Sequence, residues 1–377
     1  MAREKSFMDL ARDLAERGRY TAAPNPLVGA VVVRDGTVVG EGWHVRPGEE
    51  HAEAMALRRA GPAARGATMY VTLEPCNHHL RTPGPPCAEA VLRAGIRRLV
   101  VGHVDPNPRV NGRSLRRLRE AGVEVEVLDD PVFELQNERF FFAMREGRPF
   151  VHLKLAVTLD GRIAASGGDS RWVTGSEARL RAHALRAEAG AVLIGAGTMR
   201  ADDPLLTPRG LPEEPPRVLR AVLDPRLTIP ESSRLVSTAA EWPLVVFCGE
   251  GVSPQRRQRL EAAGVAVEVV PAGEEGLDLG VVLERLRVRG TSGVLVEGGG
   301  ETARRFLADG LVDKVTLFYA PKLVGADGVP VVGGLGVGKM AEALRFSFAG
   351  VERLGEDLAV TLYPYRSEEG RDVHRAG

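Results

Sequence analysis

One imidazole and two thiols, at His51, Cys76 and Cys87, constrain the fold of this chain more than any other feature of its sequence. Histidine and cysteine are side chains that Zn²⁺ prefers, and three of them leave a fourth tetrahedral position for water. His51 opens an expected helix, Cys76 follows an expected strand, and Cys87 opens a second expected helix. The N-terminal ends of both helices favour a thiolate. The pattern therefore predicts an open zinc site, which is typical of catalysis.

Glu53 stands two residues after the histidine, where it is poorly placed to join the same metal but can reach a metal-bound water. Zinc lowers the pKa of such a water, and a nearby carboxylate can carry its proton to a leaving group. The pattern H-x-E followed by P-C-x-x-C is the signature of zinc nucleobase deaminases. Its first half is present here. Its second half is not, because ten residues separate the two cysteines and not the two residues of the signature. The alternative is a chance His-x-Glu match beside a closed structural zinc site.

Length and composition favour a two-domain protein of the cell interior. At 377 residues the chain exceeds what one hydrophobic core usually supports. Its 50 basic and 50 acidic residues balance, so no overall field recruits nucleic acid or a membrane. Cys248 is a lone third thiol, which argues for a reducing compartment, and no apolar run approaches the length of a membrane span. We therefore expect a cytoplasmic protein that acts on a small molecule.

Strands and helices alternate on both sides of an expected domain boundary near residue 148. In the first half, the Asp35-Gly36 pair predicts a hairpin turn between strands over 30–33 and 38–42. The alternation that follows predicts a three-layer α/β/α sheet. A second alternation begins with an expected strand over 150–157.

Two glycine-rich loops of the second half each follow an expected strand. They are Gly195-Ala196-Gly197-Thr198 and Gly298-Gly299-Gly300. Glycines let phosphates approach the backbone, and the helix that follows supplies N–H donors and a positive dipole end. Neither loop is the G-x-G-x-x-G fingerprint, which disfavours an ordinary Rossmann domain. Each loop alone is compatible with a tight turn, but together, after neighbouring strands of one sheet, they favour a nucleotide.

Motifs in both halves, over about residues 6 to 363, resemble the bifunctional riboflavin-biosynthesis deaminase-reductase family. The motifs that carry the resemblance are 25–29 (NPLVG), 51–53 (HAE), 73–76 (LEPC), 105–108 (DPNP), 154–161, 168–174 (GDSRWVT), 201–204 (ADDP), 297–299 (EGG) and 320–323 (APKL). The resemblance implies a cytidine-deaminase-like α/β/α sandwich over 1–148 and a dihydrofolate-reductase-like α/β domain over 149–365. The polar composition of residues 366–377 separately predicts a disordered tail. The resemblance further implies a homo-oligomer with two activities. Zinc-dependent hydrolysis removes the 2-amino group of a phosphoribosylated pyrimidine, and NADPH then reduces the ribosyl group to ribityl.

The resemblance also implies ligand contacts, residue by residue. The expected NADPH contacts are Ala156, Trp172, Thr198, Asp202, Gly298, Gly299 and Gly300. The expected substrate contacts are Asn25, Ser170, Arg186, Leu206, Arg209 and Glu297. Lys154 and Asp202 are expected near the sugar and the nicotinamide, where a cation and an acid would neutralise developing charge. The alternatives are that Asp202 and Asp203 cap a turn before Pro204 and that Lys154 anchors a strand end.

The sequence departs from the family between the cysteines. The family usually has eight residues there, with a glycine where Leu80 stands, and this chain has ten. His78 and His79 lie in this loop and are expected to be loop or substrate contacts, with zinc ligation as the alternative. Two other functions remain open: a nucleic-acid or free-base deaminase with an accessory domain, and a structural zinc module that carries a nucleotide sensor.

Overall fold

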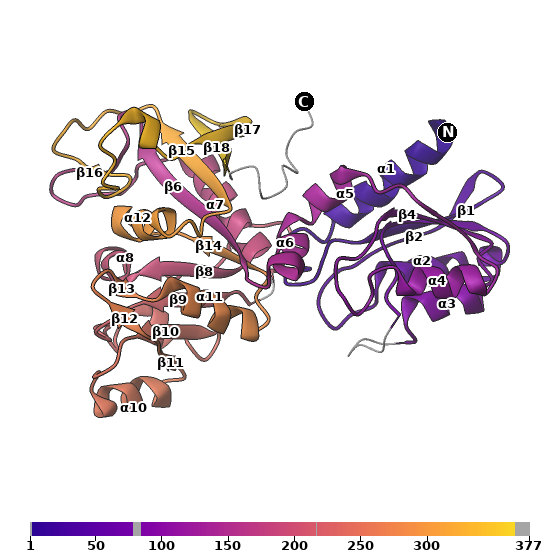
Figure 1. Cartoon of the computed structure of the whole chain (residues 1–377), viewed down its shortest axis with the longest axis horizontal. Coiled ribbons are helices and arrows are strands. Elements are labelled where there is room, and N and C mark those ends of the chain that lie inside the picture. Colours follow the sequence, from indigo (N-terminus) through magenta and orange to yellow (C-terminus); the bar gives the residue numbers. More distant parts are fainter. Residues whose placement is uncertain (1, 78–83, 216, 366–377) are drawn as a thin grey trace. The chain divides into compact units, whose positions relative to one another are not determined.

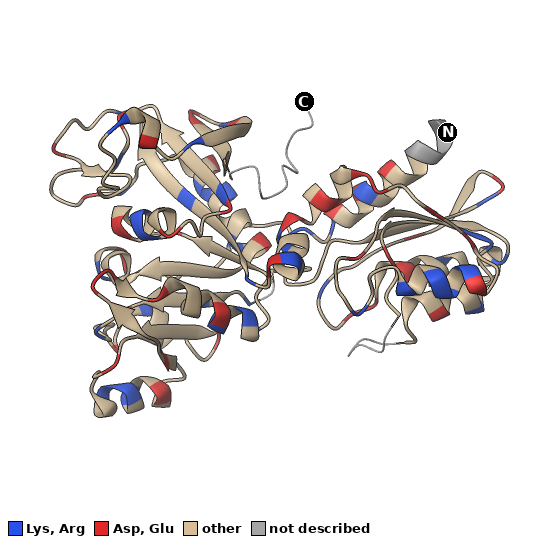
Figure 2. Cartoon of the chain, in the orientation of Figure 1, with Lys and Arg blue, Asp and Glu red and all other residues tan. Residues whose placement is uncertain are grey.

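The computed structural model describes residues 2–77, 84–215 and 217–365, which form two compact units, Met1–Gly147 and Arg148–Gly377 (Figure 1). Basic and acidic side chains are interspersed along the helices of each unit (Figure 2). Within the described ranges, no helix combines the length and the apolar character that crossing a bilayer requires. The predicted tail over 366–377 lies outside the described residues.

A five-stranded sheet forms the centre of the first unit. Its strands are β1 (Gly29–Arg34), β2 (Thr37–Trp43), β3 (Thr68–Leu73), β4 (Arg98–His103) and β5 (Glu124–Val127). They lie in the order β2-β1-β3-β4-β5, with β1 antiparallel to both of its neighbours and β3, β4 and β5 parallel. The predicted hairpin turn is confirmed, because Asp35 and Gly36 both have positive φ, as a two-residue type I′ turn requires.

Helices cover both faces of this sheet, so the predicted three-layer arrangement is confirmed. One face packs against α1 (Ala2–Glu16) and α5 (Pro131–Gln136) through side chains such as Val31 and Val100. The next residues along the strands, such as Val32 and Val101, point the other way, towards α2 (Ala52–Ala60), α3 (Cys87–Ala94) and α4 (Arg113–Glu120). The unit also contains the 3-10 helix η1 (Gly61–Ala64) and ends with α6 (Glu138–Glu146).

Two glycines of β2 set the position of α2, the helix that begins after His51. A Cβ atom on Gly40 would lie 2.2 Å from the Ala56 carbonyl oxygen, and one on Gly42 would lie 2.2 Å from the Ala52 carbonyl oxygen. Only residues without a side chain allow a helix and a strand to approach this closely.

A nine-stranded sheet forms the centre of the second unit. Its strands are β6 (Phe150–Thr158), β8 (Gly190–Gly195), β9 (Leu219–Leu223), β10 (Leu244–Cys248), β11 (Ala266–Val269), β14 (Gly293–Val296), β15 (Lys314–Ala320), β17 (Phe346–Leu354) and β18 (Asp357–Pro364). Their order is β11-β10-β9-β8-β14-β6-β15-β18-β17. The first seven strands in this order are parallel, and β18 and β17 add an antiparallel edge. Parallel strands need crossover helices on both faces, and the sequence alternation supplies them.

Helices cover both faces of the second sheet as well. One face packs against α11 (Leu279–Val288) and α12 (Gly300–Ala308). The other packs against α7 (Ser176–Ala189), α8 (Ala196–Asp202), α9 (Arg234–Ser237) and α10 (Pro254–Ala262). Short elements complete the unit: β7 (Arg162–Ala164), β16 (Val329–Pro330), β12 (Ala272–Gly273), β13 (Gly276–Leu277) and η2 (Met340–Glu342).

Eight elements of the second unit were not predicted: β7, α8, α9, β12, β13, β16, η2 and β17. The loop expected at 195–198 contains the start of α8, because two glycines in four residues obscure a helix whose Met199 is anchored in the core. Strand β17 was missed because it lies at the exposed edge and a register shift between Phe348 and Gly350 breaks its alternation of apolar residues.

Candidate active sites

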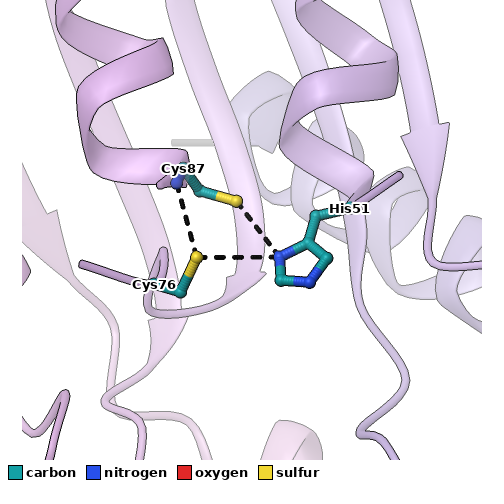
Figure 3. A group of neighbouring side chains, drawn as sticks. All are labelled: His51, Cys76 and Cys87. Atoms are coloured by element: carbon teal, nitrogen blue, oxygen red, sulfur yellow. Dashed lines mark hydrogen bonds between the residues drawn. The ribbon is translucent and has the colours of Figure 1, made fainter. Parts of the chain in front are cut away.

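In the first unit, the fold brings together the three predicted zinc ligands (Figure 3). His51 precedes α2, Cys87 is the first residue of α3, and Cys76 follows β3. The His51 Nδ1 atom lies 3.2 Å from Cys87 Sγ and 3.7 Å from Cys76 Sγ. Ligand atoms about 2.0 to 2.3 Å from a tetrahedral zinc are themselves separated by roughly 3.5 Å, so these side chains fit a zinc ion.

Even without a metal, the surroundings of the two cysteines favour the thiolate form of Cys76 over that of Cys87. A hydrogen bond from the Cys87 thiol and the neighbouring His51 ring lower the pKa of Cys76 to about 4, against the opposing effect of burial. The Cys87 backbone N–H, at the start of α3, lies 3.4 Å from the same sulfur. A helix N-terminus stabilises a thiolate, which is the form that binds a metal.

Glu53, the second residue of α2, lies beside this cluster with 3% of its surface exposed. Burial raises the pKa of Glu53, the charge on Cys76 adds to this effect, and His51 opposes it. A raised pKa means that a carboxyl group takes up a proton more readily than an ordinary glutamate does. The structure thus places a buried carboxyl group, the candidate proton carrier, next to the candidate metal site.

The predicted substrate contact Asn25 reaches the same region through a histidine that the sequence patterns did not single out. The Asn25 side-chain nitrogen lies 3.0 Å from Nε2 of His44, and the His44 ring meets the His51 ring edge to face at 5.4 Å. Burial, together with the charge of His51, lowers the pKa of His44 to about 4, so the ring is neutral at pH 7. His44 follows β2 without any spacing motif, which is why only the folded chain reveals it.

A buried carboxylate organises the chain on the other side of the cysteines. Glu74 accepts hydrogen bonds from the backbone N–H groups of Asp105, Gly112 and Ser114 and from the Ser114 hydroxyl. Burial, with the nearby charges of Glu74, Cys76 and Glu53, raises the pKa of Asp105 to about 7. Glu74 therefore ties the loop that carries the DPNP motif to the strand end that carries Cys76. His78, His79 and Leu80 lie outside the described residues.

In the second unit, three predicted residues from three elements form a charged cluster. Arg186 of α7 makes a two-pronged ion pair with Glu297, with N···O distances of 2.6 and 2.9 Å. The Lys154 amine of β6 lies 3.9 Å from the same carboxylate. Burial opposes ionisation of Glu297, but the charges of Arg186 and Lys154 prevail and lower its pKa to about 2. Burial lowers the pKa of Lys154.

The sequence did not single out His183, which extends this cluster towards the predicted contacts Leu206 and Arg209. The His183 Nδ1 atom lies 3.1 Å from the Thr207 carbonyl oxygen and 3.3 Å from an Arg186 nitrogen. Burial and the charges of Arg186 and Arg209 lower the pKa of His183 to about 4. The Leu206 side chain lies in the hydrophobic core, so a ligand would meet its main chain.

The two glycine loops predicted for a nucleotide lie next to each other at the ends of β8 and β14. A Cβ atom on Gly195 would lie 2.4 Å from the Thr302 hydroxyl, and one on Gly298 would lie 2.6 Å from the Thr302 Cβ. The Gly299 N–H donates a 3.0 Å hydrogen bond to the Thr198 hydroxyl, which joins the loops directly. Both loops run into helix N-termini, which suit a phosphate group.

The remaining predicted contacts lie on β6, on α8 and in the loop before α7. Ala156 lies on β6 two residues after Lys154, and Ser170 and Trp172 lie in the loop before α7. Asp202 ends α8, and its carbonyl oxygen accepts a hydrogen bond of 2.8 Å from Arg171. The Asp203 carboxylate accepts a 2.9 Å hydrogen bond from the Arg234 N–H, at the start of α9 and 31 residues further along the chain. This bond does not test whether the Asp202-Asp203 pair caps the turn before Pro204.

Comparison with protein families assigns each half of the chain separately. Residues 1–103 match the cytidine and deoxycytidylate deaminase zinc-binding region, and residues 149–360 match the RibD C-terminal domain. These matches agree with the fold predicted for each half.

Comparisons over the full length agree with both assignments. The chain is 42% identical to the riboflavin biosynthesis protein RibD of Aquifex aeolicus, over 96% of this chain and 99% of that protein. It is 39% identical to RibD of Escherichia coli, over 95% and 99% of the two chains. Among solved structures, RibD of Acinetobacter baumannii (form 1) superposes with a TM-score of 0.88 at 36% identity, over 97% and 99% of the two chains. A diaminohydroxyphosphoribosylaminopyrimidine deaminase/5-amino-6-(5-phosphoribosylamino)uracil reductase of Thermotoga maritima superposes with a TM-score of 0.82 at 34% identity, with the same coverage.

Proposed function

The chain belongs to the RibD family, and on that premise we propose which of its residues carry each of its two reactions. It is a bifunctional enzyme of riboflavin biosynthesis, with a zinc-dependent deaminase domain and an NADPH-dependent reductase domain. We assign deamination to residues 1–148 and reduction to residues 149–365. The observation that carries this proposal is the pairing of the His51-Cys76-Cys87 cluster with buried Glu53 in one unit and the joined glycine loops beside a charged cluster in the other.

The substrate of the first reaction is 2,5-diamino-6-(5-phosphoribosylamino)pyrimidin-4-one. The solved relative from Thermotoga maritima is named as a deaminase of this class of ribotide and a reductase of the corresponding uracil. Hydrolysis replaces the 2-amino group by oxygen and releases ammonia. NADPH reduction of the ribosyl group to ribityl follows.

In the deaminase unit, His51, Cys76 and Cys87 would hold the zinc. Zinc supplies an electrophilic centre that lowers the pKa of water towards neutrality. Glu53 takes a proton from the attacking water and delivers it to the departing amino group, as its raised pKa allows. Asn25, whose side chain is held by neutral His44, contacts the substrate.

In the reductase unit, the joined glycine loops and their neighbours would hold NADPH, which supplies a hydride. The residues that contact it are Ala156, Trp172, Thr198, Asp202, Gly298, Gly299 and Gly300. Substrate contacts come from Ser170, Arg186, Leu206, Arg209 and Glu297. Lys154 supplies a positive charge and a proton to the sugar oxygen as the ring opens, because burial lowers its pKa and makes the proton easier to release. Asp202 lies near the nicotinamide.

Three further properties belong to this proposal. The chain acts on a small phosphoribosylated pyrimidine and not on nucleic acid or a membrane. It works as a homo-oligomer, and it is located in the cytoplasm. The balance of 50 basic and 50 acidic residues supports a small-molecule substrate.

The test is to incubate the purified, zinc-loaded chain with the diaminopyrimidine ribotide, with and without NADPH. Without NADPH we expect ammonia and the deaminated ribotide to accumulate. With NADPH we expect the ribityl product and oxidation of one NADPH per ribotide. Removing zinc with a chelator should stop deamination but leave reduction of the deaminated ribotide intact. Absence of ammonia from the zinc-loaded enzyme would contradict the assignment.

A further inference from the structure

The loop that carries Ser170 and Trp172 is tied to distant parts of the second unit. This loop, residues 170–175, is the last part of the connection from β7 to α7. The Trp172 side chain is 65% exposed, and the Arg179 guanidinium stacks on its ring at 4.5 Å. An exposed aromatic ring needs an ordered backbone if it is to present a fixed surface to a ligand.

Four hydrogen bonds fix this loop, three of them between its backbone and side chains from elsewhere in the chain. The Trp172 and Thr174 carbonyl oxygens accept from Lys322 and Arg179, each at 2.7 Å. The loop's own Arg171 donates a 2.8 Å hydrogen bond to the Asp202 carbonyl oxygen. The fourth bond, also 2.7 Å, runs from the Gly175 N–H to the Asp357 carboxylate. The loop is therefore linked to α8, to the segment after β15, to α7 and to β18.

Asp357 differs from the other three because it is a buried acid with only 3% of its surface exposed. It is the first residue of β18, directly after the turn of the β17-β18 hairpin, drawn in yellow in Figure 1. Gly175 is the N-cap of α7 and has no side chain with which to accept a hydrogen bond from the helix. The first N–H groups of a helix need acceptors, and a negative charge at this end is stabilising. Asp357 supplies a buried acceptor and a negative charge at this helix start.

The hydrogen bond between Gly175 and Asp357 lies at the junction of two groups of expected ligand contacts. The loop with Ser170 and Trp172 ends at Gly175, and α7, which carries His183 and Arg186, begins there. The turn of the hairpin also packs closely against α7, since a Cβ atom on Gly355 would lie 2.8 Å from the Glu177 carboxylate. A single acid thus fixes the junction between two groups of expected ligand contacts.

We propose that Asp357 is a positioning residue for the reduction: by binding the Gly175 N–H it holds the 170–175 loop and the start of α7 in the conformation that binds NADPH and the ribosyl substrate. This inference rests on the proposed function, because it takes Trp172 and Ser170 as ligand contacts. Asp357 itself touches neither ligand. Its loss would lower the fraction of enzyme in the binding conformation, and the apparent affinity falls by the same factor.

The experiment measures the KM values for NADPH and for the deaminated ribotide in Asp357→Ala, Asp357→Asn and the matched control Glu356→Ala. Glu356 is the exposed neighbour of Asp357 in the same turn. We expect Asp357→Ala to raise at least one KM by about tenfold or more with a smaller change in kcat. Asp357→Asn keeps an oxygen acceptor but lacks the charge, so it should raise the same KM by a smaller but measurable factor. Glu356→Ala and the deamination rate of all three variants should match wild type.

A purely structural role predicts a different result. Asp357→Ala would then lower the melting temperature while both KM values of the folded enzyme stay at wild-type levels, and this result would overturn the proposal. If Asp357→Ala does not fold, Asp357→Asn decides, because the amide lacks the charge and should still raise KM measurably. Trp172→Ala tests the proposed function separately. Wild-type KM values in Trp172→Ala would remove Trp172 from the NADPH site, whereas wild-type KM values in the Asp357 variants would remove the positioning role.

Discussion

Replacing Glu297 by glutamine should destabilise the second unit by an amount that depends on pH. Glu297 is buried between Arg186 and Lys154, whose charges lower its pKa from 4.5 to about 2. The side chain is 12% exposed, so solvent screens the interaction little. A lowering of this size corresponds to about 3 kcal/mol of folding free energy at neutral pH.

Because the folded-state pKa of Glu297 is depressed, the stabilising contribution is fully present above pH 4.5 and is lost as the pH falls towards 2. At pH 3 only about 1 kcal/mol of it should remain. The difference in unfolding free energy between wild type and Glu297→Gln should therefore shrink by about 2 kcal/mol between pH 7 and pH 3.

Urea denaturation, monitored by tryptophan fluorescence, measures this difference in unfolding free energy. Trp172 and Trp242 report on the second unit. Glu284→Gln is the matched control, because Glu284 pairs with Arg287 at the surface of the same unit at 2.7 Å. It should show no resolvable change, since exposed ion pairs contribute little. If Glu297→Gln leaves the unfolding free energy unchanged at pH 7, or lowers it equally at pH 7 and pH 3, the electrostatic reasoning is refuted.

Three further predictions concern single side chains. Cys76→Ser and Cys87→Ser should each lose zinc, and full zinc occupancy by elemental analysis in both variants would remove these residues from the metal site. Asp202→Asn should lower NADPH oxidation with the deaminated ribotide by about tenfold or more while deamination continues, and an unchanged oxidation rate would exclude Asp202 from the reduction. Glu74→Gln should destabilise the first unit by about 2 to 3 kcal/mol, because the amide nitrogen would face backbone N–H donors. Urea denaturation monitored by Trp43 fluorescence measures this change, and unchanged stability would contradict the role assigned to the four hydrogen bonds of Glu74.

The sequence predicted the zinc cluster because its chemistry is local. His51 and Glu53 lie two residues apart at the start of one helix, and a histidine with two cysteines is a donor set that zinc prefers. The glycine loops were expected after neighbouring strands of one sheet, and the sheet order, with β8 next to β14, confirms this. The charged cluster of the second unit could be predicted only from the family resemblance, since 111 residues separate Arg186 from Glu297.

Other side chains escaped prediction because their roles exist only after folding. His44 has no motif and is defined by its contact with Asn25 and its edge-to-face packing on His51. Asp357 is an ordinary acid of a hairpin turn until the hairpin places it 2.7 Å from the Gly175 N–H, 182 residues earlier in the chain. Hydrogen bonds over such separations are set by topology and packing, which local patterns do not encode.

Glu53→Gln tests most directly whether Glu53 moves the proton in a zinc-dependent deamination. The amide keeps the shape of the side chain but cannot carry a proton, so zinc content and NADPH reduction of the deaminated ribotide should stay at wild-type levels. Ammonia release from the diaminopyrimidine ribotide should fall by about 10² to 10⁴. Release of ammonia at the wild-type rate, from a variant that still holds its zinc, would contradict the account.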